Sequence, residues 1–265
     1  MKCLTNREDW SPDYRVDDVS RRLGEIEMYY NSNRNLRELW DDILLPLLRT
    51  CGAQSAVEIG SAPGQNLIEL ARGLGITPFG IEYTEEGAQL NRRLFVRNGL
   101  SPDNVINEDF FSPTLDTHFG RFDITLSFGF VEHFDDPTPV IRRQIDFCRI
   151  GGHAVIVIPN IQGLYYVWNN TFNRRVIETH NTTMMKDQMF FKLCEGIGNL
   201  EIIFSGAVGA FDYGLLTHNG KFFPRAGISV LRRMAPVLHV FDKYFLANLG
   251  LGQPPYLMVV GKRIG

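Results

Sequence analysis

A run of five small residues follows a predicted strand, Ser55–Ile59, and precedes a helical pattern that starts near Leu67. The run reads Gly60, Ser61, Ala62, Pro63 and Gly64. Small side chains let backbone N–H groups and the positive end of a helix approach a polar ligand closely. The dinucleotide pattern G-x-G-x-x-G is not met, because Ala62 and Gln65 replace its second and third glycines. The turn therefore predicts a nucleotide site that holds something other than a pyrophosphate.

Two acidic residues lie next to this turn in the predicted sheet. Glu58 comes just before the small residues, where its carboxylate can accept backbone hydrogen bonds or face a cationic ligand. Glu82 lies in a second predicted strand, Thr77–Tyr83, about 20 residues after the turn. A carboxylate there can bind a ribose, since it accepts two hydrogen bonds and the diol supplies two donors. The alternative for Glu82 is an exposed acid at a strand end. Tyr83 could cover an adenine ring or pack at the sheet edge.

A histidine follows the fourth predicted strand. The strand Phe122–Phe128 leads into the loop G-F-V-E-H-F-D-D-P, residues 129–137, which contains His133. Ligands of α/β sheets bind at the carboxyl ends of the strands, so this loop is expected to border the reacting group. An imidazole takes a proton from a hydroxyl or ammonium group near neutral pH. His133 is therefore the candidate general base, and the alternative is a structural histidine that holds the loop.

These motifs together resemble the class I S-adenosylmethionine-dependent methyltransferases. The first motif of that family is an acidic residue, a hydrophobic residue and G-x-G-x-G, which here runs from Glu58 to Gly64 with Ala62 at the middle glycine. The run E-H-F-D-D-P, residues 132–137, is similar to the motif that follows the fourth strand in the small-molecule branch. The resemblance covers residues 55–159 in order, and a C-terminal hairpin more loosely.

The resemblance implies S-adenosylmethionine as the cofactor and transfer of its methyl group by in-line displacement. It assigns the methionine end of the cofactor to Gly60, Ser61, Ala62 and Gly64, the ribose to Glu82, the adenine to Asp109 and Phe110, and the surroundings of the methyl group to Ser127 and Phe128. The loop after Phe128 lacks the N-P-P-Y or D-P-P-Y motif of enzymes that methylate amino groups of nucleic acids and of glutamine, which favours an oxygen acceptor on a small metabolite. The expected substrate is a polar small molecule, such as a sugar or another biosynthetic intermediate. An N-methyltransferase on a small amine, a catalytically silent binding subunit and a nucleotide-dependent oxidoreductase are the alternatives.

Strand and helix patterns alternate along the chain and would position these residues. Helical periodicity covers Asn35–Leu48, Thr84–Asn98 and Thr138–Cys148, and further strands are predicted at Asn104–Phe111, His153–Pro159, Leu200–Ser205 and Tyr256–Gly261. This order predicts an α/β fold with a Rossmann-like seven-stranded, mostly parallel sheet and helices on both faces. By the resemblance, the last two strands form an antiparallel hairpin.

Three parts of the chain are expected: an N-terminal helical lid segment (1–50), a cofactor-binding core (51–159) and a last part (160–265) with a substrate-pocket insertion, a lid helix and the hairpin. In the last part, the helical stretch Gly227–Leu246 is apolar and predicts a lid or dimer helix. Contact with a membrane, a partner or a phosphorylated substrate is the alternative. A homodimer is compatible with this pattern.

Aromatic residues in the first and last parts are candidates for substrate binding. Tyr29 and Tyr30 could fold over the cofactor, since aromatic rings suit a sulfonium cation. Tyr165 and Trp168 lie among asparagines and threonines, a mixture that suits a polar small molecule. The alternative for each pair is ordinary packing near the surface.

Composition argues against several classes of protein. The chain has 265 residues, of which 44% are hydrophobic and 22% charged, as in a soluble protein with a sizeable core. A formal net charge of −3 gives no basic field for nucleic acid, so no nucleic-acid partner is expected. The four cysteines are scattered and the histidines lack ligand-like spacing, which predicts reduced thiols and no metal site. The sequence shows no signal-peptide core and no apolar run long enough for stable membrane insertion, which predicts a cytoplasmic protein.

Overall fold

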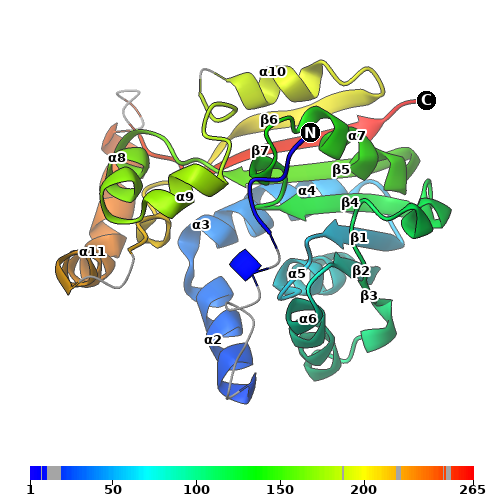
Figure 1. The fold of residues 1–265 in the computed structure, drawn as a ribbon, viewed down its shortest axis with the longest axis horizontal. Coiled ribbons are helices and arrows are strands. Elements are labelled where there is room, and N and C mark those ends of the chain that lie inside the picture. The colour runs from blue at the N-terminus through cyan, green and yellow to red at the C-terminus, as the bar shows by residue number, and fades with distance from the viewer. Residues whose placement is uncertain (7, 11–18, 187, 219–221, 247, 249–251) are drawn as a thin grey trace.

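The structure is a computed structural model that describes residues 1–6, 8–10, 19–186, 188–218, 222–246, 248 and 252–265. Its centre is a seven-stranded sheet with the order β3-β2-β1-β4-β5-β7-β6 (Figure 1). The strands are β1 (Ser55–Ile59), β2 (Thr77–Glu82), β3 (Val105–Asn107), β4 (Phe122–Phe128), β5 (Cys148–Pro159), β6 (Leu200–Val208) and β7 (Tyr256–Arg263). β1 to β5 are parallel, and β7 runs antiparallel between β5 and β6. This confirms the predicted mostly parallel sheet with an antiparallel end.

Helices cover both faces of the sheet, as predicted. One face packs against a continuous helical run of α3 (Arg34–Arg37), a π-helical segment (Glu38–Leu44) and α4 (Leu45–Arg49), together with α5 (Gln65–Leu74) and α6 (Glu85–Arg97). The other face packs against α7 (Thr138–Phe147) and α10 (Met189–Glu195). In Figure 1, α5 and α6 lie below the strands, and α7 and α10 lie above them. The other α-helices named in Figure 1 are α2 (Val19–Ser32), α8 (Gly163–Phe172), α9 (Arg174–Thr179) and α11 (Phe222–Phe241). α11 continues as a π-helical turn, Asp242–Leu246.

The third strand is shorter than the sequence pattern predicts. A strand was expected over Asn104–Phe111, but β3 ends at Asn107. The Asp109 carboxylate accepts a hydrogen bond from the N–H of Phe111 at 2.9 Å, which turns the chain away from the sheet. Asp109 and Phe110 therefore lie on a turn beyond the strand, where both can face a ligand.

The N-terminal segment divides into parts with different roles. Its last part belongs to the core, because Leu39, Trp40 and Leu44 of the helical run are fully buried against the sheet. The first residues cross to the loop after β4, where the N–H of Leu4 donates to the carbonyl of His133 at 2.7 Å. Residues 7 and 11–18 of the expected lid lie outside the described residues. Residues 34–49 thus pack against the sheet.

Candidate active site at the carboxyl ends of the strands

A cavity of about 410 Å³ opens at the carboxyl ends of β1, β2 and β4. This is the place where the strand order reverses between β1 and β4, the usual ligand position in doubly wound sheets. The predicted site residues that line it are Gly60, Ala62, Glu82, Tyr83, Asp109, Phe110, Phe128 and His133. The structure therefore brings together residues that are spread over more than seventy positions of sequence.

Several further lining residues have no counterpart in the sequence analysis. They are Cys3, Thr5 and Trp10 from the N-terminus, and Phe111, Gly129, Phe130 and Phe134 from the loops after β3 and β4. For the loop after β4, the phenylalanines on either side of Glu132 and His133 were a sequence signal that could have identified these residues. No local pattern marks the first group, because their place in the site depends on a long-range pairing of Cys3 with Phe134.

The backbone N–H groups of the small-residue turn donate hydrogen bonds to β2. The N–H groups of Gly60 and Ser61 both donate to the carbonyl of Ile81, at 2.9 and 3.1 Å. The N–H of Ala62 donates to the Glu82 carboxylate at 3.3 Å. These three amides fasten the turn to β2, so they are not the free donors that the sequence pattern suggested.

Two glycines of the turn are required by their neighbours. Gly60 has φ +69°, and a Cβ there would lie 3.0 Å from the ring of Phe130. Gly64 has φ +101°, and a Cβ there would collide with the side chain of Asn91, which also donates to the Ser61 hydroxyl at 2.7 Å. Ser61 and Gly64 thus lie beneath the turn and do not line the cavity, whereas the Gly60 backbone does. Only a residue without a side chain fits either glycine position.

Glu82 is the best-positioned acid of the cavity. Its side chain is buried, and one oxygen accepts from the N–H and the hydroxyl of Thr84 at 2.9 and 2.6 Å. The other oxygen accepts only the long bond from Ala62. Burial raises the pKa of Glu82, and the hydrogen bonds from Thr84 and Ala62 partly offset this. A ligand with hydroxyl donors would satisfy the remaining lone pairs of this carboxylate.

Glu58 has a different environment from the one expected. Its carboxylate is buried behind the turn, where one oxygen accepts from the Asn66 amide at 2.6 Å and the other has no partner. Burial raises its pKa to about 8, against the Asn66 hydrogen bond, with a further increase from the charge of Glu82. Glu58 neither binds the turn amides nor lines the cavity.

Asp109 and Phe110 are fixed from α7. The Arg143 side chain donates to the Phe110 carbonyl at 2.8 Å, and its guanidinium lies 5.5 Å from the centre of the Phe110 ring. Phe110 is buried, whereas Asp109 is exposed at the cavity rim with one oxygen committed to Phe111. The pair presents an apolar ring and a carboxylate to the same space, which suits a planar heterocycle with an exocyclic amine.

His133 borders the cavity in its neutral form. Its Nδ1 lies 2.7 Å from the Thr179 carbonyl, and the Trp10 ring packs edge-on at 4.9 Å between ring centres. Burial and the neighbouring His180 lower the pKa of His133 to about 3, although the carbonyls of Thr179 and Gly129 act in the opposite direction. A histidine that donates from Nδ1 keeps the lone pair of Nε2.

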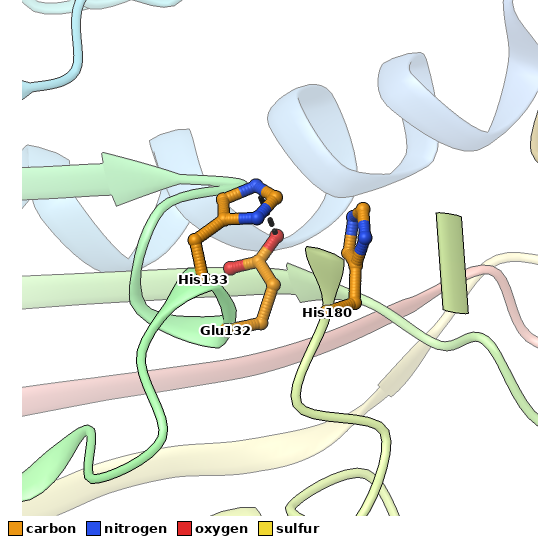
Figure 2. Close-up of side chains that lie close together, drawn as sticks. All are labelled: Glu132, His133 and His180. Carbon is orange, nitrogen blue, oxygen red and sulfur yellow. Dashed lines mark ion pairs between the residues drawn. The ribbon is translucent and has the colours of Figure 1, made fainter. Parts of the chain in front are cut away.

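Glu132 and His180 lie beside this histidine. The Glu132 carboxylate is fully buried, neither oxygen has a hydrogen-bond partner, and burial raises its pKa to about 8. One of its oxygens is 3.9 Å from Nε2 of His133, and the His180 ring centre is 4.5 Å from that of His133. Figure 2 shows the carboxylate turned toward the His133 ring, with His180 approaching from a separate segment. Burial lowers the pKa of His180 to about 4, so both rings are neutral.

The other predicted site residues lie outside this cavity. Ser127 is fully buried within β4, and Trp168 donates to the Thr217 carbonyl at 2.9 Å. Tyr165 is 1% exposed, with its hydroxyl bonded to the Gln253 carbonyl and the Asp212 N–H. Its environment is therefore that of a core residue.

The two predicted lid tyrosines also bind elsewhere. The Tyr30 hydroxyl donates to Asn66 at 3.1 Å, and the Tyr29 hydroxyl accepts from Asn33 at 3.0 Å. Burial and the nearby Asp212 raise the pKa of Tyr29 to about 12. Neither ring lines the cavity.

The sheet order with an antiparallel β7 and the cavity at the β1/β4 reversal define a Rossmann-like methyltransferase fold. A family model described as a methyltransferase domain matches residues 32–191. The chain therefore belongs to the methyltransferase domain family, and S-adenosylmethionine is the expected cofactor of that family. No curated protein sequence matches the chain significantly.

Solved structures with the same fold share little sequence with this chain. A geranyl diphosphate methyltransferase in complex with GPP and sinefungin has 13% identity and a TM-score of 0.59, covering 97% of this chain and 99% of its own. Geranyl diphosphate C-methyltransferase from Streptomyces coelicolor A3(2), with Mg²⁺, geranyl diphosphate and S-adenosyl-L-homocysteine, has 11% identity and a TM-score of 0.57, covering 97% of each chain. The [4+2]-cyclase SpnF has 16% identity and a TM-score of 0.55, covering 88% and 86%. At these identities the similarity establishes the fold.

Two other expectations concern cysteines and membranes. All four cysteines are free thiols, as the sequence predicted. Among the described residues, no helix is both long enough and apolar enough to span a bilayer.

Proposed function

We propose that this protein transfers the methyl group of S-adenosylmethionine to a hydroxyl of a polar small molecule by in-line displacement. The observation that carries the proposal is that Gly60, Glu82, Asp109 and His133 all line the same cavity. It joins a glycine turn, two acids and a histidine at the carboxyl ends of successive strands. Its volume falls in the range of about 300–1,000 Å³ that is typical of small-molecule sites.

The residues present fit the cofactor. The free lone pairs of the buried Glu82 carboxylate match a ribose diol, and Phe110 with Asp109 matches an adenine and its amine. Gly60 and Ala62 leave room for the methionine end. The rings of Phe128 and Phe130 give the cavity π faces that attract a sulfonium cation. The bound cofactor supplies a methyl group on positively charged sulfur, and the protein aligns the acceptor with it.

His133 remains the proposed general base. Its neutral ring and Nε2 lone pair allow it to accept the hydroxyl proton as the new carbon–oxygen bond forms. A pKa of about 3 makes it a weak base, so alignment of the two reactants contributes more of the rate.

The acceptor class rests on the loop after β4. This loop reads Gly129, Phe130, Val131 and carries no N-P-P-Y or D-P-P-Y motif, which supports an oxygen acceptor over a small amine. The net charge of −3 supports a small molecule over nucleic acid. A cytoplasmic location and a homodimer belong to the same proposal.

A catalytically silent binding subunit is the second candidate, because the similar structure of the [4+2]-cyclase SpnF shows that this fold also occurs in a protein named for an activity other than methyl transfer. The discriminating experiment begins with calorimetry of S-adenosylhomocysteine binding, with NAD as the control ligand. We expect heat and a higher Tm with S-adenosylhomocysteine only. No heat with that ligand would overturn the proposal. Turnover on a pool of hydroxylated metabolites then separates the enzyme from the silent subunit.

His133→Ala tests the role of the histidine within the same assay. We expect kcat to fall about 100-fold, within the range for loss of a general base, while S-adenosylhomocysteine affinity changes little. Undiminished turnover would remove His133 as the base.

A further inference from the structure

Three side chains beside the cavity form a compact donor group. One ligand atom each from Glu132, His133 and His180 lies within 4.8 Å of the other two. Glu132 and His133 are adjacent in the loop after β4, and His180 comes from the segment after α9 (Figure 2). Two imidazoles and one carboxylate are a common ligand set for divalent transition metals in proteins.

The hydrogen bonds of both histidines prepare them for ligation. Nδ1 of His133 lies 2.7 Å from the Thr179 carbonyl, and Nδ1 of His180 lies 2.7 Å from the Val176 carbonyl. A carbonyl can only accept, so each Nδ1 carries the proton and each Nε2 keeps its lone pair. Metal-binding histidines typically have this arrangement, in which the second ring nitrogen donates to a backbone carbonyl.

The carboxylate is the second, independent sign of a ligand. Glu132 is 0% exposed, and neither of its oxygens has a hydrogen-bond partner. A buried carboxylate without a partner is costly unless a cation or a proton compensates it. One oxygen faces Nε2 of His133 at 3.9 Å, so the uncompensated group is aimed at the two imidazoles.

We propose that Glu132, His133 and His180 bind a divalent transition metal ion, with Zn²⁺ as the representative ion. Imidazole donors favour such ions over Mg²⁺, which prefers oxygen ligands. Bonds of about 2.0–2.2 Å require ligand atoms about 3.3 Å apart, so the three side chains need to close by less than about 1 Å each. Three protein ligands leave a coordination position open.

The metal position adjoins two cavities. His133 lines the cofactor cavity, and it also borders a second cavity of about 210 Å³ that His180 lines. Thr5 and Trp10 border both. An exogenous ligand on the ion is therefore within reach of the space next to the cofactor.

Resting on the proposed function, the open position would hold the acceptor hydroxyl. Ligation lowers the pKa of a bound hydroxyl, so its proton leaves to solvent. The oxygen then bonds to the methyl carbon, and the carbon–sulfur bond breaks with its electron pair left on sulfur. A ligated Nε2 cannot accept a proton, so metal binding would replace the role of His133 as base.

The test is metal binding by the full chain, independent of turnover. The protein is stripped with a chelator and titrated with Zn²⁺, then with Co²⁺ as a spectroscopic probe and Mg²⁺ as a comparison. The variants are Glu132→Gln and His180→Asn, whose amide can still donate to the Val176 carbonyl. His153→Asn is the matched control, because His153 pairs with Ile124 in the first half of β4, away from the loop after that strand that carries Glu132 and His133. The Tm shift with S-adenosylhomocysteine reports in each case on folding and on the cofactor site.

We expect one equivalent of Zn²⁺, weakened about 100-fold or more in Glu132→Gln and His180→Asn and unchanged in His153→Asn. Ligand-field bands of Co²⁺ in the wild type supply the same evidence if Glu132→Gln does not fold. Absence of stoichiometric Zn²⁺, or wild-type affinity in both variants, would overturn the metal site. A Tm shift with S-adenosylhomocysteine but no Zn²⁺ refutes the metal site alone, whereas Zn²⁺ binding without that shift supports the metal site and refutes the proposed function.

Discussion

The two ends of the parallel strands treat their acids in opposite ways. At the amino end, Asp123 of β4 accepts hydrogen bonds from the N–H groups of Gln54 and Ser55 at 2.9 and 3.0 Å, and pairs with Arg149. Burial alone would raise the pKa of Asp123, but Arg149 and the β1 donors outweigh it and the pKa is lowered. This carboxylate joins the starts of β1 and β4.

At the carboxyl end, the acids lack such compensation. Glu58 and Glu132 are fully buried, each has an oxygen without a partner, and burial raises the pKa of each to about 8. Glu82 uses one oxygen to hold its own turn and presents the other to the cavity. The protein thus satisfies the acid that joins the strand starts and leaves acids incompletely satisfied at the end of the sheet where ligands bind, and of these Glu82 lines the cavity.

The largest expected effect is on the pH dependence of stability. The folded-state pKa of Glu58, about 8, exceeds its ordinary value of 4.5, so between these values the folded protein holds one more proton than the unfolded chain. Rising pH therefore lowers the free energy of unfolding, by about 1.4 kcal/mol per pH unit for this group. Urea denaturation from pH 5 to pH 8 should show a shallower decline in Glu58→Gln. Parallel profiles would mean that Glu58 ionises normally.

Glu82→Ala should have the next largest effect. Loss of two charge-assisted hydrogen bonds to the ribose, at about 1.5 kcal/mol each, weakens S-adenosylhomocysteine binding about 100-fold. Calorimetry measures the affinity. Glu85→Ala is the matched control, since Glu85 is an exposed acid in the first turn of α6 and does not line the cavity. Equal affinities in the two variants would contradict a binding role for Glu82.

Asp123→Ala should lower the stability of the fold and leave cofactor affinity unchanged, the opposite of Glu82→Ala. The free energy of unfolding falls by about 2–3 kcal/mol, because two backbone donors and Arg149 lose their partner, while cofactor affinity is unchanged. Since the folded-state pKa of Asp123 is lowered, its contribution is present above the ordinary carboxyl pKa and is lost as pH falls through the lowered value. Chemical denaturation with Asp103→Ala, an exposed acid, as control checks this. A weaker cofactor affinity would show that the two ends are not independent.

Asp109→Asn should have the smallest effect. The asparagine keeps the hydrogen bond from the Phe111 N–H and loses only the charged acceptor for the adenine amine. At this exposed position we expect about 1 kcal/mol, or about fivefold, in S-adenosylhomocysteine affinity. Inosine-containing cofactor analogues carry a carbonyl oxygen in place of the amine, so with them the wild type should lose its advantage over the variant. A larger penalty in the variant for the analogue than for the natural ligand would refute the assignment.

Local patterns identified the elements and most of the cavity wall. β1 and β4 begin and end at the predicted residues. α6 begins one residue inside the predicted range Thr84–Asn98, because the Thr84 side chain caps it by accepting from the Gly87 N–H. Glu82 was found from its place at a strand end about 20 residues after the turn, and Asp109 from the family resemblance. The spacing of strands and turns is a short-range property, so sequence can show it.

The partners of individual polar groups were not predictable. No local sequence pattern showed that the N–H groups of Gly60 and Ser61 donate to the Ile81 carbonyl, or that the Glu58 carboxylate accepts from the Asn66 amide. Tyr165 looked like a pocket residue, yet the Asp212 N–H and the Gln253 carbonyl engage its hydroxyl in the core. These contacts join segments whose approach depends on how the whole sheet packs.

The sequence by itself determined the parallel sheet, the glycine turn and the acids at successive strand ends, because these follow from periodicity and turn chemistry over a few residues. Tertiary structure alone decided that Cys3, Thr5 and Trp10 line the cavity and that His180 comes to lie beside Glu132 and His133. Forty-odd residues separate His180 from that pair, and no spacing rule operates over such a distance. Glu132 is buried and loses its water only when those segments pack together. This desolvation leaves its carboxylate without compensation, so that a bound cation would stabilise it.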